Sequence, residues 1–194
     1  MTDYLSRGTL LLSAPEMLDP NFMHTVVLIF DHDDSGAMGA IVNRPLEATV
    51  ADAFPHHPAL SQLSLQLRDG GPVGQEMLQV LHLSDPAANP PGVVGPGIDL
   101  GDGVHLGGDL DWVAERIQAK KATEDQIRFV VGYSGWAPGQ LENEIEGHSW
   151  LPLPPTADLV FATGDPESIW RAGMGRLSGE GPSLAYLPPD PSWN

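Results

Sequence analysis

The sequence predicts a single domain that combines short strands with helices. The chain of 194 residues is long enough for one substantial core, and no stretch of it resembles an interdomain linker. Its 22 glycines and 19 prolines favour many turns and short elements over long helices. Apolar runs bounded by turn residues dominate the first half, whereas helical apolar patterns occur mainly in the second half.

Three apolar segments near the N-terminus predict the first strands. Residues 9–14 (TLLLSA) and 25–30 (TVVLIF) are continuous apolar runs, which are typical of buried strands. Residues 37–43 (AMGAIVN) follow after the polar stretch DHDDSG, so the second and third segments are predicted to form a hairpin. Gly36 would supply the positive φ angle at its turn.

The middle of the chain predicts a helix, a strand and a loop. Residues 48–54 (ATVADAF) form a short helical segment that ends at Pro55, and residues 76–84 (EMLQVLHLS) form another strand. Residues 85–103 hold too many prolines and glycines for regular structure, which predicts a long surface loop.

The second half is predicted to hold three helices and one strand. Asp109 caps a helix that runs to Lys120, and Asp165 followed by Pro166 begins the last helix. Residues 126–133 (QIRFVVGY) form a strand that turns into a helix near Pro138. The first and last of these helices each bury one face, made of Leu110, Val113, Ala114 and Ile117 in the first and of Trp170, Gly173, Met174 and Leu177 in the last.

The composition argues against several classes of protein. Asp and Glu number 26 against 9 Lys and Arg, which leaves a formal charge of −17 spread along the chain. DNA binding depends on cations that neutralise phosphates, so direct binding should be weak, and an anionic membrane surface is equally unfavourable. The lack of cysteine excludes disulfides and thiolate sites and fits a cytoplasmic protein. The sequence also shows no signal-peptide pattern and no membrane-spanning apolar run, so we expect no membrane partner.

Ser134 lies in the segment GYSGWAPGQLENEI and matches a serine nucleophile only in part. A nucleophile elbow has the pattern Gly-x-Ser-x-Gly, in which both glycines permit a strained turn. Gly132 and Ser134 fit this pattern, but Trp136 replaces the second glycine. We therefore interpret the segment as a structural turn from strand to helix, with Trp136 filling the core beneath it.

Other segments resemble metal or cofactor sites without completing them. Residues 31–42 (DHDDSGAMGAIV) begin like a calcium loop, but Val42 stands where a bidentate glutamate is required. In GPGIDLG the third glycine, Gly101, comes one position too late for a dinucleotide-binding loop. The seven histidines show no zinc spacing, and His82 is expected to be a satisfied or outward-facing strand residue. We therefore predict neither metal nor cofactor.

Asn43 and Arg44 close a buried strand immediately before Pro45, where a cation needs a partner. The guanidinium of Arg44 could pair with an internal carboxylate such as that of Glu144, which we favour, or it could hold an anionic ligand or partner. The segment GGPVG (70–74) could likewise be a backbone site for an anion, although a turn into the next strand is the favoured interpretation.

Five segments, in their order and spacing, resemble the bacterial YqgE/AlgH family: APEMLDPNFMHTVVLIF, DSGAMGAIVNRPLEATVADAF, GGPVGQEMLQVLH, FVVGYSGWAPGQLENEIEGHSWL and DLVFATGDPESIWRAGMGRL. The resemblance covers nearly the whole chain and implies one domain over residues 1–194. It implies an α+β fold, a single compact domain with a mainly antiparallel sheet or split barrel flanked by helices. Part of the family is named for transcriptional regulation, and the family has no established biochemical activity.

The resemblance also suggests candidate residues for binding a ligand or partner. They lie at characteristic positions of the family, and they are Asn43, Arg44, Gly71, Gly74, Gln140 and Glu144. No catalytic residue is assigned. We expect a non-enzymatic binding or regulatory module that recognises a protein or a small ligand. The alternative is an enzyme with an unfamiliar site around Asn43, Arg44, Gln140 and Glu144, and a direct DNA-binding regulator is less favoured.

Overall fold

The structure is a computed structural model that describes residues 5–58, 60–84, 97–108, 110–119, 123 and 125–177. Its strands are β1 (Leu10–Ser13), β2 (Val26–Asp33), β3 (Gly36–Ile41), β4 (Pro45–Thr49), β5 (Gln66–Asp69), β6 (Val73–Leu83), β7 (Ile98–Asp99), β8 (Val104–Leu106), β9 (Ile127–Trp136) and β10 (Trp150–Leu153). Its helices are α1 (Val50–Ala53), the short 3-10 helix η1 (Leu60–Gln62), α2 (Leu110–Gln118), α3 (Gln140–Glu146), α4 (Ala157–Val160) and α5 (Pro166–Met174).

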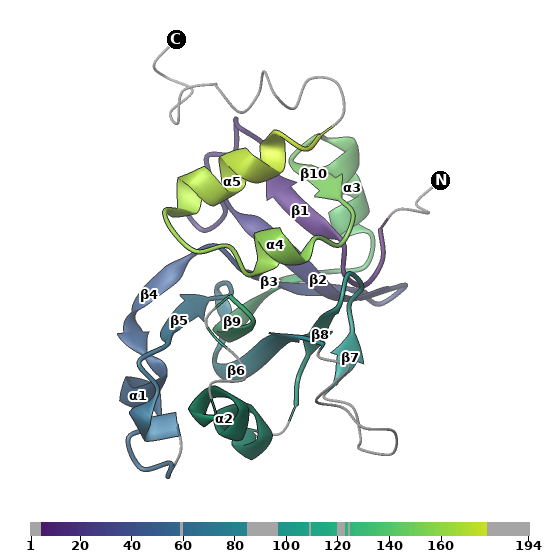
Figure 1. Ribbon diagram of the computed structural model, residues 1–194. Helices are drawn as coiled ribbons and strands as arrows, with labels where there is room; N and C mark the ends of the chain where they lie inside the picture. Colours follow the sequence, from purple (N-terminus) through teal and green to yellow (C-terminus); the bar gives the residue numbers. More distant parts are fainter. Residues whose placement is uncertain are drawn as a thin grey trace.

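The strands form one large sheet that stays open (Figure 1). Their order is β10, β1, β2, β3, β9, β6, β8 and β7, and β5 joins β4 to β9. All neighbours are antiparallel except β5 and β9, which are parallel. The sheet does not close into a barrel, and helices flank it. The predicted α+β class with a mainly antiparallel sheet is therefore confirmed.

The apolar runs of β1 and β2 are buried on both faces of the sheet. Alternate residues enter different cores: Leu10 and Leu12 pack into one, and Leu11 packs into the other. Side chains of neighbouring strand residues point to opposite faces, so a continuous apolar run requires cover on both sides. The predicted strands at residues 9–14, 25–30 and 37–43 and their hairpin are confirmed.

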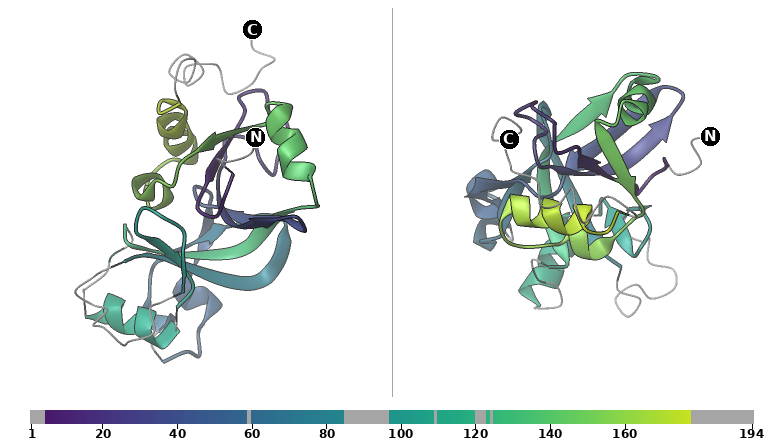
Figure 2. Two further views of the ribbon diagram at one scale, coloured as in Figure 1. Left: turned by 90° about the vertical axis from the view of Figure 1, so that its right-hand side faces the viewer. Right: turned by 90° about the horizontal axis from the view of Figure 1, so that it is seen from above.

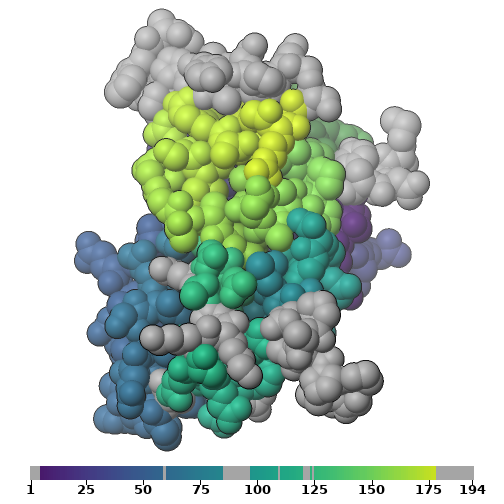
Figure 3. Space-filling view, in the orientation of Figure 1, coloured from purple at the N-terminus to yellow at the C-terminus, as the bar shows by residue number. Residues whose placement is uncertain are grey.

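Helices supply that cover (Figure 2). Helices α4 and α5 lie on one side of β1 and β2, and α3 lies on the other. A third apolar core joins α1, η1 and α2 to β5, β6 and β9. Figure 3 shows α4 and α5, in yellow-green, as a continuous surface above the teal strands β7 and β8. No helix within the described ranges is long and apolar enough to cross a membrane.

The predicted helices are present with small changes at their ends. Helix α1 lies within residues 48–54, and α2 ends at Gln118, whereas Asp109 and Lys120 lie outside the described residues. Helix α5 begins as predicted, because the Asp165 carboxylate accepts a hydrogen bond from the Ser168 N–H and Pro166 occupies the first turn. Its buried residues include Trp170, Gly173 and Met174.

Strand β9 corrects the prediction of a turn at Ser134. The strand continues to Trp136, because Ser134, Gly135 and Trp136 extend the ladder by pairing with β3. Earlier in the same strand, Val130 and Val131 pair with β5. Trp136 does fill a core, as predicted.

The predicted loop at residues 85–103 is partly wrong. Residues 85–96 lie outside the described residues, but Ile98 and Asp99 form β7, which pairs with β8. Composition alone could not show this short strand, because its stability depends on backbone hydrogen bonds to a partner strand.

Candidate functional site

Asn43 is a buried link between three elements. Its side-chain oxygen accepts a hydrogen bond from the Val26 N–H (2.9 Å), and its Nδ2 donates to the carbonyls of His24 (3.0 Å) and Pro166 (2.9 Å). These bonds join the end of β3 to the start of β2 and to the first turn of α5. Both polar groups of the Asn43 amide are thus bonded inside the protein. These bonds hold the backbone at the end of β3, directly before Arg44.

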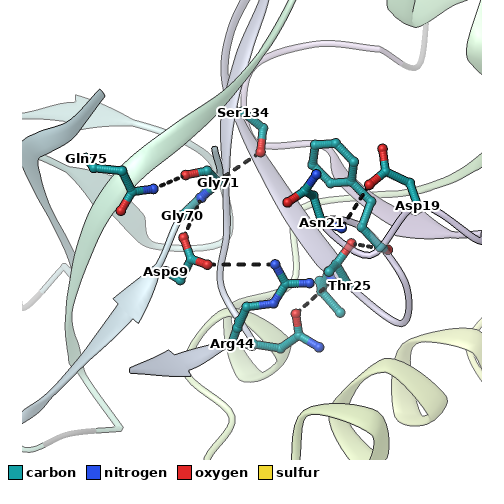
Figure 4. A network of polar contacts seen from close by, with 12 residues as sticks. Asp19, Asn21, Thr25, Arg44, Asp69, Gly70, Gly71, Gln75 and Ser134 are labelled. Carbon is teal, nitrogen blue, oxygen red and sulfur yellow. Dashed lines mark hydrogen bonds and ion pairs between the residues drawn. The ribbon is translucent and has the colours of Figure 1, made fainter. Parts of the chain in front are cut away.

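Arg44 lies between β3 and β4, and its partner is Asp69 (Figure 4). The Asp69 N–H donates to the Arg44 carbonyl (2.9 Å), and Nη1 of Arg44 lies 3.7 Å from Oδ2 of Asp69. The two side chains are 28% and 25% exposed. At 3.7 Å the contact is an ion pair but exceeds hydrogen-bonding distance. An internal carboxylate partner is thus present, but the prediction that named Glu144 is wrong.

Gly71 closes the loop between β5 and β6 beside this ion pair. Its N–H donates to Oδ1 of Asp69 (3.1 Å), and its carbonyl accepts a hydrogen bond from the Gln75 side chain. At a φ of 140°, a Cβ here would collide with Oγ of Ser134, so the position requires glycine. Gly74 follows in β6, against the Tyr133 ring. The GGPVG segment is the turn into β6, and the Gly71 amide serves Asp69.

A turn from the N-terminal part of the chain directly precedes His24, whose carbonyl accepts a hydrogen bond from Asn43 (3.0 Å). Within it, the Asn21 N–H donates to the Asp19 carboxylate (2.8 Å), and the Thr25 hydroxyl donates to the Phe22 carbonyl (2.8 Å). The turn carries two exposed apolar side chains, Leu18 (70% exposed) and Met23 (42%). We call residues 18–23 the Asp19 turn, and we call Asn43, Arg44, Asp69 and Gly71 the Arg44 corner.

Arg44 differs from the other arginines of the described chain. Arg7, Arg171 and Arg176 are also partly exposed, and each donates a hydrogen bond of 2.8 Å or less to a carboxylate. The remaining three are buried, namely Arg68, Arg116 and Arg128. Within the described residues, the Arg44 guanidinium makes the 3.7 Å ion pair and no hydrogen bond. Its donors are therefore available to another acceptor.

Gln140 and Glu144 lie at a different place. Oε2 of Glu144 accepts from the indole N–H groups of Trp136 (2.9 Å) and Trp150 (2.8 Å), and Oε1 accepts from the Gln140 amide (2.8 Å). Trp136 pairs with Ala37 at the start of β3, six residues before Asn43. Asn43, in contrast, is bonded to Val26, His24 and Pro166, and Arg44 is paired with Asp69. The four residues of the proposed enzyme site therefore fall into two groups that share no hydrogen-bond partner in the described structure.

Two further sequence motifs make contacts within the protein. Ser134 is fully buried, and its hydroxyl donates to the Gly70 carbonyl (3.1 Å). In DHDDSG, Asp31 bonds to Arg7 (2.7 Å) and Asp33 accepts from the Ser35 N–H (2.7 Å), as expected of a hairpin turn. No group of three or more His, Cys, Asp or Glu residues in the described ranges is arranged to hold a metal ion.

His82 is a buried strand residue. Its ring stacks on that of His105 in β8, with centroids 5.5 Å apart, and meets Trp112 edge to face. Its Nδ1 lies 3.3 Å from the Leu83 carbonyl. The prediction of a satisfied strand histidine is consistent with this position.

His24, which the sequence did not single out, borders the Arg44 corner. It has a positive φ of 52°, its ring lies 4.5 Å from that of Trp170, and its Nε2 is buried without a hydrogen bond in the described structure. Burial lowers the pKa of the imidazole; Glu167 partly opposes this effect and Arg171 adds to it. Strained backbone and unsatisfied polar atoms concentrate at functional regions. No sequence signal could have identified this residue, because both features arise from tertiary contacts.

The lowered pKa of His24 predicts lower stability in mild acid. Below about pH 6.5 the unfolded chain binds a proton at His24 that the folded protein resists, so unfolding takes up protons and stability falls as pH decreases. We expect the urea midpoint to fall more steeply between pH 7 and pH 5 for the wild type than for His24→Asn, since asparagine tolerates the positive φ angle but does not titrate. Equal pH slopes for the two proteins would contradict this role.

The chain belongs to the AlgH-like family, whose model matches residues 10–181. Two similar relatives are named UPF0301 proteins. The one from Chlorobium limicola is 34% identical over 192 residues, covering 99% of this chain and 97% of the relative. The one from Cytophaga hutchinsonii is 33% identical over 190 residues, covering 98% and 100%.

Solved structures share the fold. A crystal structure of a protein from Corynebacterium diphtheriae matches with a TM-score of 0.75 at 22% identity, covering 96% of this chain and 95% of the other. The solution structure of the AlgH protein from Pseudomonas aeruginosa matches with a TM-score of 0.68 at 28% identity, covering 97% and 96%.

Proposed function

We propose that this protein is a non-enzymatic, cytoplasmic binding or regulatory module that recognises a partner through the Arg44 corner. The observation that carries the proposal is the guanidinium of Arg44. It lies mostly covered beside Asp69 and yet makes no hydrogen bond within the described residues, whereas every other partly exposed arginine there is bonded to a carboxylate. A cation whose donors remain available is suited to recognition.

The surroundings of the corner favour a protein partner. Leu18 and Met23 expose apolar surface on the Asp19 turn, which is tied to Asn43 through the His24 carbonyl. Exposed apolar side chains beside a polar anchor are typical of protein interfaces, in which methionine and arginine are enriched. The enzymatic alternative loses support, because Gln140 and Glu144 are bonded to each other and Glu144 to two tryptophans, and they share no partner with Asn43 or Arg44 in the described structure.

Direct DNA binding remains the less favoured proposal. The chain has nine Lys and Arg residues, of which three arginines are buried and three are bonded to carboxylates. These six residues therefore offer little charge to neutralise phosphates, and the net charge of −17 repels the duplex.

Replacing Arg44 should abolish recognition without destabilising the fold. An ion pair of 3.7 Å between partly exposed side chains contributes little, so we expect Arg44→Gln to change the free energy of unfolding by less than about 1 kcal/mol. The same variant should fail to retain partners that the wild-type protein captures in an unbiased lysate and metabolite screen. Urea unfolding and quantitative capture measure the two effects.

Arg171→Gln is the matched control, because Arg171 is equally exposed (29%) but already bonded to Glu167. It should retain every partner. If Arg44→Gln captured the same partners as the wild type, the Arg44 corner would not be the recognition site. A loss of several kcal/mol in Arg44→Gln would instead assign the residue to the fold.

A further inference from the structure

We propose that the Arg44 corner binds the carboxylate of an acidic side chain in a protein partner, and that Asp69 is a built-in competitor for Arg44. This inference rests on the proposed function and specifies its ligand chemistry. The partner segment also carries an apolar residue next to the acidic one. This apolar residue packs on Leu18 and Met23 of the Asp19 turn.

The ion pair with Asp69 leaves the recognition capacity of Arg44 largely unused. A guanidinium has five N–H donors and binds a carboxylate best through two parallel hydrogen bonds of about 2.7–2.9 Å. Here the Nη1 to Oδ2 distance is 3.7 Å, and no hydrogen bond joins the two side chains in the described structure. Asp69 therefore compensates the charge of Arg44 without occupying its donors.

Asp69 is prevented from closing on Arg44 by its other contacts. Its Oδ1 accepts the Gly71 N–H at 3.1 Å, and its backbone N–H is bonded to the Arg44 carbonyl at 2.9 Å. The first bond orients the carboxylate toward the loop, and the second holds the Asp69 backbone beside Arg44. The guanidinium donors that Asp69 does not occupy would form two short bonds with a second carboxylate.

Charge favours a single carboxylate over a more highly charged anion. The chain carries −17, and Asp69 adds a negative charge within the corner itself, so a phosphate dianion meets stronger repulsion than a monoanion. A lone acidic residue on a protein partner keeps the negative charge small. The exposed fractions of Leu18 (70%) and Met23 (42%) provide apolar contact that a free small carboxylate would not use.

The test uses two blocked peptides, acetyl-Gly-Leu-Glu-Leu-Gly-amide and its Gln counterpart, with sodium acetate as the small-carboxylate probe. Binding is followed through the Arg44 Nε–H and Gly71 N–H signals in NMR spectra of the full chain at constant ionic strength. We expect the Glu peptide to bind at least about tenfold more tightly than the Gln peptide, which lacks the charge-assisted pair, and than acetate, which lacks the apolar contact. The Arg171 signal should not shift.

Two variants make the assignment specific. Arg44→Gln should abolish the preference for the Glu peptide. Asp69→Asn should raise affinity for the Glu peptide about threefold or more, because it removes the competing charge while the amide oxygen can still accept the Gly71 N–H. A purely structural Arg44–Asp69 pair would give no gain in affinity.

Each contrary outcome has a distinct meaning. Equal binding of the Glu and Gln peptides would overturn the carboxylate assignment, whether or not the Asp69 variant folds. Acetate binding as tightly as the Glu peptide would overturn the protein-partner source in favour of a small carboxylate. If Arg44→Gln loses captured partners but none of the probes binds, this inference fails and the proposed function stands.

Discussion

Replacing Arg128 by methionine is expected to lower the free energy of unfolding by about 3–5 kcal/mol. Arg128 is buried in β9 and donates hydrogen bonds to three carbonyls, those of Val42 (2.9 Å), Val160 (2.6 Å) and Ala162 (2.8 Å). It thereby connects the end of β3 to the end of α4 and the residues that follow it. Methionine fills similar volume but leaves three buried acceptors without these donors.

Urea unfolding and thermal melting measure this effect. For a chain of this size the melting temperature should fall by about 10 °C or more. Arg176→Met is the control, because Arg176 is 38% exposed and paired with Asp158 at the surface, where removing an ion pair costs about 1 kcal/mol or less. Similar losses in the two variants would show that the three carbonyls do not depend on Arg128.

Replacing Glu144 by leucine is expected to lower the free energy of unfolding by about 2–4 kcal/mol. Its Oε2 accepts hydrogen bonds from the indoles of Trp136 and Trp150, both of which are buried. Leucine would leave two N–H donors with no acceptor in an apolar core, and an unsatisfied buried donor costs about 1–3 kcal/mol.

Glu144→Gln is the matched variant, because its amide oxygen can still accept from an indole. It should lose less stability than Glu144→Leu and keep a native-like tryptophan fluorescence maximum. The leucine variant should show an altered indole environment in the folded state. If both substitutions were equally costly, the negative charge of Glu144 rather than its acceptor geometry would be responsible.

The sequence identified Gln140 and Glu144 but not their internal hydrogen bonds. Trp136, Gln140 and Glu144 are spaced four residues apart, a pattern that could have indicated contacts along one side of α3. The second indole comes from Trp150 in β10, which no local pattern connects to Glu144. Arg128 also left a signal, since it is a lone cation within the apolar stretch IRFVV, but its three acceptors lie far away in the chain.

By itself, the sequence determined most of the strands and helices and several of the turns between them, while the α+β class followed from the family resemblance. The strands and helices follow from local chemistry: apolar runs such as residues 25–30 require burial, and Asp165 with Pro166 can begin a helix without distant contacts.

Only the tertiary structure decided which side chains share a site. It paired Arg44 with Asp69, bonded Glu144 to the indoles of Trp136 and Trp150, and put the ring of His24 against that of Trp170. An arginine beside a strand end needs a partner on any fold, but strand pairing chooses the carboxylate that lies next to it. Because β5 carries Asp69 to the Arg44 carbonyl through a backbone hydrogen bond, the identity of that partner depends on sheet register, which short-range sequence patterns do not encode.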